Sequence, residues 1–178
     1  MTEIKVIDLF AGPGGLGEGF TAFRDAAGKQ RFKIALSIEK EASAHRTLTL
    51  RSFFRQYPDA SAPEAYYAFM RGELGTSPED TLYRLPELRS AYEAASREAA
   101  QFELGQKGKH ASIYKAIRDS LNGDEWVLLG GPPCQAYSLV GRARNYGGAK
   151  NYDADTDHRN FLYLEYLRII AKFQPMAF

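Results

Sequence analysis

The sequence predicts an α/β protein with a mostly parallel sheet and a helical insertion. Two observations carry this prediction. Short apolar runs that read as buried strands alternate with segments of helical periodicity, and this order is typical of parallel sheets. The chain has 178 residues, of which 44% are hydrophobic and 25% charged, a composition that supports one ordinary folded domain.

The first part of the chain shows the alternation most clearly. Lys5–Phe10 reads as a short buried strand, and a helix is expected from Leu16 to about Ala27, closed by Gly28. Phe32–Ile38 then reads as a second strand, and Glu41 to about Phe54 as a second helix. Together these segments predict a strand–helix–strand–helix unit.

The alternation is interrupted between about residues 57 and 109. This region shows no convincing strand, and helical segments are separated there by Gly, Ser and Pro turns. Its Tyr66, Tyr67 and Phe69 suggest either a base-stacking platform or a helix that buries aromatic side chains against the sheet, and the second interpretation is favoured. We interpret the region as a helical insertion.

The strand pattern returns after the insertion. Ile113–Leu121 reads as a helix and Asp124–Gly130 as a buried strand, followed by a long loop at about 135–157 that is rich in Gly, Arg, Asn and Tyr. Loops of this length in compact domains are usually functional or mobile. Phe161–Phe173 reads as an amphipathic helix, and Gln174–Phe178 as the first residues of another strand. Because a core strand does not normally end a protein there, we expect the chain to be a truncated piece of a longer one.

Composition excludes several classes of protein. The formal net charge is +1, so no global basic field points to nucleic acid, and any such contact must be local. No apolar run approaches the roughly 18 residues that span a membrane, and the N-terminus lacks a secretory pattern. A single cysteine excludes an internal disulfide and fits a reducing cytoplasm. The three histidines show no metal-ligand spacing, so no metal is expected.

A glycine loop follows the first strand. Gly12, Gly14 and Gly17 form a G-x-G-x-x-G pattern that opens a helix, and Glu39 stands at the end of the second strand. Glycines let the backbone approach a ligand closely, and a carboxylate at that place can accept hydrogen bonds from ribose hydroxyls. The pattern predicts a nucleotide-type cofactor, either nicotinamide or S-adenosylmethionine, and leaves a tight turn without a ligand as the alternative.

The single cysteine follows two prolines at the end of an apolar run, in Gly131-Pro132-Pro133-Cys134-Gln135. A free cysteine is often a small buried hydrophobe. Proline, however, fixes the backbone, and a parallel strand presents its carboxyl end to the reaction site. We therefore interpret Cys134 as a nucleophile.

Three stretches together form a pattern along the chain: Asp8-Leu9-Phe10-Ala11-Gly12-Pro13-Gly14-Gly15, then Gly131–Gln135, then Asp157-His158-Arg159-Asn160-Phe161-Leu162. In this the chain resembles the cytosine carbon-5 DNA methyltransferase family. The resemblance implies a Rossmann-like, S-adenosylmethionine-dependent methyltransferase fold of which residues 1–178 are the N-terminal catalytic portion. It implies double-stranded DNA with a flipped cytosine as substrate, and a restriction–modification role with a cognate restriction endonuclease as a possible partner.

The resemblance also assigns the site. Cys134 would be the nucleophile, and Gln135, Ser138 and Arg142 would meet the flipped cytosine or the DNA backbone. A larger group would bind the cofactor: Phe10 against the adenine, Ala11, Gly12, Gly14 and Gly15 in the loop, Glu39 on the ribose hydroxyls, and Pro133 and Leu162 as lining.

The chemistry explains why a cysteine is required. Attack of a thiolate on carbon 6 makes carbon 5 of cytosine nucleophilic enough to take a methyl group, after which the carbon-5 proton leaves and the thiolate is eliminated. The base must leave the duplex to be reached. Arg142, Arg144 and Lys150 in the loop, with Tyr137 and Tyr146, could contact phosphates and fill the gap, although a solvated role is the simpler interpretation of each alone.

Some features of the family are not found. An acidic residue near the adenine is expected after the third strand, and the region sought, Lys109–Ile113, offers none. The glutamate motif that contacts the cytosine ring and the target-recognition domain are also absent, so the isolated chain is expected to be inactive. Alternatives are a transfer-RNA cytosine methyltransferase, a non-catalytic S-adenosylmethionine-binding half that needs a second chain, and a nicotinamide oxidoreductase.

Overall fold

The computed structural model describes residues 3–57, 61–106, 108–132 and 161–178. Four parallel strands form one sheet in the order β3-β2-β1-β4. The strands are β1 (Ile4–Leu9), β2 (Phe32–Glu39), β3 (Ala99–Gln101) and β4 (Trp126–Gly130). The prediction of an α/β fold with a mostly parallel sheet is confirmed.

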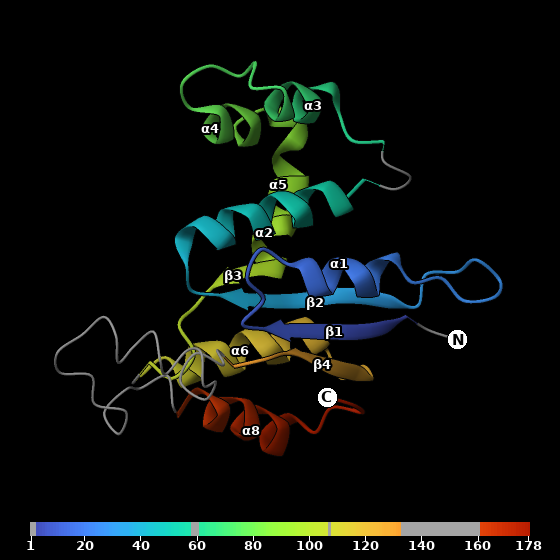
Figure 1. Ribbon diagram of the computed structural model, residues 1–178, viewed down its shortest axis with the longest axis vertical. Coiled ribbons are helices and arrows are strands. Elements are labelled where there is room, and N and C mark those ends of the chain that lie inside the picture. The colour runs from blue at the N-terminus through green and yellow to red at the C-terminus, as the bar shows by residue number, and fades with distance from the viewer. Residues whose placement is uncertain (1–2, 58–60, 107, 133–160) are drawn as a thin grey trace, which may run out of the picture.

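Helices cover both faces of this sheet (Figure 1). The described helices are α1 (Gly15–Ala22), α2 (Ala42–Arg55), α3 (Glu64–Met70), α4 (Pro78–Tyr83), the short 3-10 turn η2 (Pro86–Leu88), α5 (Arg89–Glu98), α6 (His110–Leu121) and α8 (Leu162–Phe173).

Alternate residues of β1 face two different apolar cores, as the period of a strand requires. Val6 packs with Ile34, Val127 and Phe20 of α1. Ile7 and Leu9 pack on the other face, where α6 and α8 supply apolar side chains that include Ile113, Ile117 and Ile169. The sheet is therefore buried on both sides, which explains why its strands read as continuous apolar runs.

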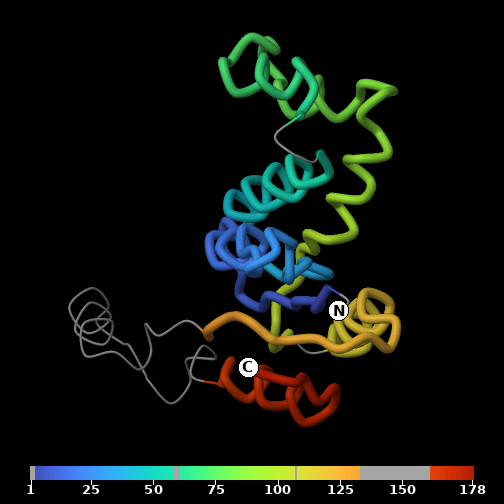
Figure 2. Tube along the Cα trace, turned by 90° about the vertical axis from the view of Figure 1, so that its right-hand side faces the viewer, coloured from blue at the N-terminus to red at the C-terminus, as the bar shows by residue number. Residues whose placement is uncertain are grey.

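A third core lies outside the sheet. Phe53 of α2 is fully buried against Leu82, Leu88 and Ala95, with Tyr66 and Phe69 partly buried beside it. Figures 1 and 2 show α3 and α4 far from the sheet, with α2 between them. The aromatic side chains of this region thus pack on α2 and on one another, rather than on the sheet as the sequence suggested.

The expectation that residues 57–109 contain no strand is wrong at one place. Ala99–Gln101 forms β3, which pairs with Ser37–Glu39 of β2. The stretch around it is rich in Ala and Glu and therefore reads as helix, but pairing with β2 overrides that local preference. Because β3 is so short, the first half of β2 has only β1 as a partner strand in the described part of the chain.

The end of α1 also differs from the prediction. The helix stops at Ala22 instead of about Ala27, and Phe23 is already extended. Asp25 Oδ1 accepts hydrogen bonds from the backbone N–H groups of Ala27 and Lys29, both at 3.0 Å. This side-chain turn offers the backbone an alternative to the helix and explains the earlier end.

The last residues, Gln174–Phe178, read as the start of another strand, and in the structure they make one isolated bridge to β4. The Leu128 N–H donates to the Ala177 carbonyl and the Met176 N–H to the Trp126 carbonyl, each at 2.9 Å. The resulting bridge between Val127 and Ala177 is parallel. In the part of the chain that the structure describes, no helix is both long and apolar enough to cross a membrane.

Candidate functional site

Three parallel strands end side by side, and the candidate site lies at these carboxyl ends. Leu9 of β1 is in register with Ile38 of β2 and with Gly130 of β4. Open parallel sheets place their ligands at this edge. At Gly130 φ is +114°, and a Cβ there would lie 1.8 Å from the Leu9 carbonyl oxygen. Only glycine therefore allows β4 to end beside β1 and to lead on into Gly131.

The glycine loop turns the chain from β1 into α1. The Ala11 N–H donates to the Ile38 carbonyl and the Gly14 N–H to the Ala11 carbonyl, both at 3.0 Å. Gly14 caps α1 with φ +86°, and a Cβ there would lie 2.7 Å from Leu48 Cδ1 of α2. The loop is therefore packed directly on α2, and glycine is required at this position for both conformation and space.

Glu39 holds this loop against the end of β2. Its Oε2 accepts a hydrogen bond from the Gly12 N–H at 2.8 Å, while Oε1 accepts from the N–H groups of Lys40 at 2.8 Å and Glu41 at 2.7 Å. An ionised carboxylate offers roughly four lone-pair sites. Three are occupied here, so about one remains for a ligand, on Oε2.

A cavity of about 250 Å³ opens beside these groups. Its walls are mostly apolar, with the Glu39 carboxylate on one side, and its lining residues are Phe10, Ile38, Glu39, Lys40, Phe102, Leu104, Gly131 and Leu162. Three residues predicted to bind the cofactor, Phe10, Glu39 and Leu162, are thus brought together from the turn after β1, the end of β2 and the start of α8. Ala11, Gly12, Gly14 and Gly15 follow Phe10 in the loop but do not line this cavity.

Leu162 belongs to a wall built by two segments that are distant in sequence. It is 4% exposed, and its Cδ2 would lie 3.1 Å from a Cβ placed on Gly105, where φ is +84°. One turn further along α8, Glu165 accepts a hydrogen bond from His110 at 2.8 Å and pairs with Arg168. These contacts tie the start of α8 to α6 and fix the wall.

Asp8 is a buried carboxyl group on β1, below the loop. It is 1% exposed, and its Oδ2 has no hydrogen-bond partner in the described residues. Burial raises the pKa of Asp8 to about 6; the positive charge of Arg55 lowers it, and the negative charge of Glu39 raises it further. The cofactor-loop end of β1 thus carries a titratable group that the sequence analysis did not single out.

The missed strand also changes where an acidic residue should be sought. The third strand ends at Gln101, so the residues that follow it are Phe102, Glu103 and Leu104, and not Lys109–Ile113. Glu103 pairs with Lys40 at 3.2 Å, and its two neighbours line the cavity. Knowledge of where β3 lies would have identified Glu103 as the acidic residue after the third strand.

The proposed catalytic residues lie outside the described part of the chain. Pro133, Cys134, Gln135, Ser138, Arg142 and the loop at 135–157 belong to residues 133–160. The described chain reaches Pro132, directly after the cavity residue Gly131. Within the described residues, no group of three or more His, Cys, Asp or Glu side chains is arranged to hold a metal ion.

A larger cavity, of about 600 Å³, lies elsewhere. It is bounded by the first halves of β1 and β2 and by α5 and α6, with Lys5, Lys33, Arg97 and Asp119 among its lining residues. None of its lining residues belongs to the glycine loop, and Phe102 is the one lining residue that it shares with the smaller cavity. Geometry therefore favours the smaller cavity as the cofactor site.

The fold and the site together define an α/β protein with a candidate ligand cavity at the carboxyl ends of parallel strands. Residues 97–178 match the model of the family described as C-5 cytosine-specific DNA methylase. The chain belongs to this family, and its sheet and helices form a Rossmann-like methyltransferase fold.

Curated relatives agree with this assignment. The type II methyltransferase M.Bpa9945I of Bacillus paralicheniformis is 34% identical over 188 aligned positions, which cover 97% of this chain and 39% of that protein. M.AgeI of Thalassovita gelatinovora is 28% identical, covering 98% of this chain and 27% of that protein. The putative M.MjaORF1200P of Methanocaldococcus jannaschii is also 28% identical, covering 98% and 47%. The chain thus spans less than half the length of these relatives. No solved structure gives a significant match.

Proposed function

We propose that this chain is the N-terminal part of the catalytic domain of a DNA (cytosine-5-)-methyltransferase that uses S-adenosylmethionine in restriction–modification. The observation that carries the proposal is the cavity that joins Phe10, Glu39 and Leu162 at the strand ends, together with the place of its lining residue Gly131, three residues before Cys134 in the sequence. Family membership and the printed names of the relatives, which are type II methyltransferases, support the reaction class. Double-stranded DNA is the proposed substrate, and the cytoplasm the proposed compartment.

The residues present fit the nucleoside part of the cofactor. A volume of about 250 Å³ is smaller than the roughly 300–1,000 Å³ of whole-ligand sites, so it suits a nucleoside rather than the complete molecule. Phe10, Phe102 and Leu162 provide apolar walls for a flat base. Glu39 keeps about one free lone-pair site for a ribose hydroxyl. Glu103, after β3, is the acidic residue that we assign to the adenine side.

The remainder of the cofactor would lie along the loop. Nothing lies within 4 Å of the position that a Cβ would take on Gly12, so the backbone is open to a ligand there, and the loop leads into the first N–H groups of α1. When bound, the cofactor supplies a methyl group on a positively charged sulfur.

Cys134 is proposed as the nucleophile of the reaction. Its thiolate adds to carbon 6 of the flipped cytosine, carbon 5 takes the methyl group, and loss of the carbon-5 proton then eliminates the thiolate. Gln135, Ser138 and Arg142 are proposed to contact the base or the DNA backbone, and Pro133 to line the cofactor pocket. These roles rest on the order Gly131-Pro132-Pro133-Cys134 directly after β4.

The proposed organisation divides the chain into a cofactor-binding sheet that includes β3, a helical insertion that begins at about residue 57 and ends with α5, and a catalytic loop at about 135–157. Target recognition would reside in other parts of the parent protein, because this chain spans less than half the length of its relatives. We therefore propose that the isolated chain does not methylate DNA.

A calorimetric titration with S-adenosylmethionine tests the cofactor assignment. NAD is the ligand control, Glu39→Ala the test variant, and Glu87→Ala, an exposed glutamate of η2, the matched control variant. Loss of a hydrogen bond to a charged group predicts an affinity at least about tenfold weaker for Glu39→Ala and unchanged for Glu87→Ala. Equal heats with NAD, or unaltered binding in Glu39→Ala, would contradict the proposed site.

A further inference from the structure

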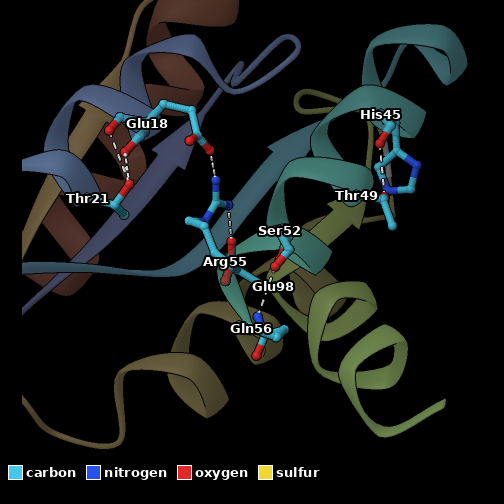
Figure 3. A network of polar contacts seen from close by, with 9 residues as sticks. Glu18, Thr21, His45, Thr49, Ser52, Arg55, Gln56 and Glu98 are labelled. Atoms are coloured by element: carbon cyan, nitrogen blue, oxygen red, sulfur yellow. Dashed lines mark hydrogen bonds and ion pairs between the residues drawn. The ribbon is translucent and has the colours of Figure 1, made fainter. Parts of the chain in front are cut away.

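Arg55, the last residue of α2, joins two helices that otherwise belong to different parts of the fold. Figure 3 shows its guanidinium between Glu18 of α1 and Glu98 of α5, and each carboxylate is hydrogen bonded to a different terminal nitrogen. The side chain of Arg55 is 15% exposed and that of Glu98 13%, whereas that of Glu18 is 39% exposed. The bridge is thus largely shielded from solvent at Arg55 and at Glu98, and less so at Glu18.

The two glutamates of this bridge connect Arg55 to different parts of the candidate site. Glu18 lies in the first turn of α1, and its own N–H donates to the carbonyl of Gly14, the residue that caps this helix after the glycine loop. Glu98 ends α5 and is followed directly by β3, whose next residues lead into the cavity wall at Phe102 and Leu104. A single guanidinium therefore connects the loop side of the cofactor site with the β3 side.

Arg55 also affects the charge below the loop. Its Nε and the Oδ2 of Asp8 are both buried without a hydrogen-bond partner in the described residues. The positive charge of Arg55 lowers the pKa of Asp8, against the burial that raises it. Two further titratable groups interact electrostatically with Asp8. Glu39 of β2 raises the pKa of Asp8, and Asp8 in turn raises the pKa of Tyr166 of α8.

Because Arg55 and Glu98 are shielded from solvent, their ion pair should contribute more to stability than an exposed pair does. Exposed ion pairs contribute little, because water and salt screen them. A partly buried charge that loses one of its partners, by contrast, is left desolvated and without compensation. Planar guanidinium groups are suited to holding two carboxylates in fixed directions, which an ammonium group does less well.

We propose that Arg55 is a positioning residue for the glycine loop, through which the end of α5 controls the order of α1 and hence the affinity for the cofactor. The part that concerns the cofactor rests on the proposed function, whereas the coupling between α5 and α1 does not. A change at Glu98 therefore reaches α1 by way of Arg55. This gives the end of α5 a role in cofactor binding from a distance.

Hydrogen exchange of the α1 amides tests the coupling without any ligand. In Glu98→Gln we expect the amides of Gly17–Ala22 to exchange about tenfold faster, the size expected for one charge-assisted hydrogen bond. Glu93→Gln is the matched control, since Glu93 lies on the same helix and pairs with Arg89 on the surface. Amides of β4 serve as the internal reference for global stability.

A double-mutant cycle identifies the route. In an Arg55→Met background, Glu98→Gln should produce no further acceleration in α1. Should Arg55→Met not fold, the cycle uses Glu18→Gln, Glu98→Gln and their combination, and the two single effects should not add. Equal exchange in Glu98→Gln and Glu93→Gln, or additive effects in either cycle, would overturn the proposal.

The pKa of the Asp8 carboxyl tests the electrostatic role of Arg55, because a purely structural role would leave this pKa unchanged. Its titration, followed by carbon-13 NMR, should shift to higher pH in Arg55→Met and stay near the wild-type midpoint in Arg55→Lys, which keeps the charge. An unchanged midpoint in Arg55→Met would contradict the electrostatic role.

Cofactor titration of the same variants separates this proposal from the proposed function. Weaker S-adenosylmethionine binding in Glu98→Gln, with Glu93→Gln unchanged, supports both. Absence of binding by the wild-type chain argues against the cofactor assignment and leaves the exchange result to decide the coupling.

Discussion

Gly14 offers the sharpest test of how the cofactor loop is built. Alanine at this position meets two separate costs. With φ at +86°, the left-handed conformation destabilises a residue with a Cβ by about 1–2 kcal/mol. The added Cβ would also lie 2.7 Å from Leu48 Cδ1, and Leu48 is only 1% exposed, so it cannot turn away into solvent. Overpacking of this kind costs about 1–3 kcal/mol, and Gly14→Ala should therefore lose about 2–5 kcal/mol in total.

Gly28 provides the matched control. Its φ is +75°, but nothing lies within 4 Å of the position that its Cβ would take. Gly28→Ala should therefore show only the conformational cost of about 1–2 kcal/mol. The difference between the two variants isolates the contact between the loop and α2.

Equilibrium unfolding in urea, followed by the fluorescence of the single tryptophan, measures both variants. Trp126 is 4% exposed, so its emission reports the opening of the sheet core. With a denaturant slope of about 1–3 kcal/mol per molar, the midpoint of Gly14→Ala should fall below that of Gly28→Ala by about 1 M. If the two variants unfold at the same urea concentration, the loop does not rest on Leu48 and the reasoning is refuted.

Three further predictions follow from the site. The folded-state pKa of Asp8, about 6, lies above its ordinary value of 3.8. Between these two pH values the folded chain therefore binds more protons than the unfolded chain does. The free energy of unfolding thus falls as the pH rises from about 4 to about 6. Relative to wild type, Asp8→Asn should therefore gain up to about 3 kcal/mol between pH 4 and pH 7 in urea titrations, and a constant difference would refute the assignment. Leu162→Ala should cost about 2–4 kcal/mol, because a side chain that is 4% exposed leaves a void, whereas exposed Leu167→Ala should cost little. In the full-length protein, DNA with 5-fluorocytosine at the target should form a denaturation-resistant adduct, because fluorine cannot leave as a proton does. Cys134→Ser should abolish that adduct, and its persistence would exclude Cys134 as the nucleophile.

Much of the fold could be predicted because its local signals agree with its tertiary structure. The apolar runs at β1, β2 and β4 are long enough to be buried on both faces, and the glycines after β1 mark a turn that only they can form. The place of Glu39 beside the glycine loop follows from the parallel order of β1 and β2. The grouping of Phe10 and Leu162 with Glu39 came from the family resemblance, and the three residues line one cavity.

The parts that were missed depend on contacts distant in sequence. Ala99–Gln101 has no strand signal of its own, and it becomes β3 only because Ser37–Glu39 offers an edge. The error moved the expected acidic residue from Glu103 to the region of Lys109. Nothing in the sequence near Arg55 or Asp8 indicates that the charge of one acts on the other, since that relation exists only after α2 has packed against β2 and β3 of the sheet.

The short β3 has a consequence for the behaviour of the chain in concentrated solution. Beyond the three residues that pair with it, β2 has no neighbouring strand on that side in the described part of the chain, and such edges invite aggregation. Lys33 stands on this stretch and is exposed. A lysine there opposes strand addition, because a second chain would have to bury or displace its charge. Replacing Lys33 by an apolar β-branched residue would remove this protection, so any redesign of the chain for higher expression should leave it in place.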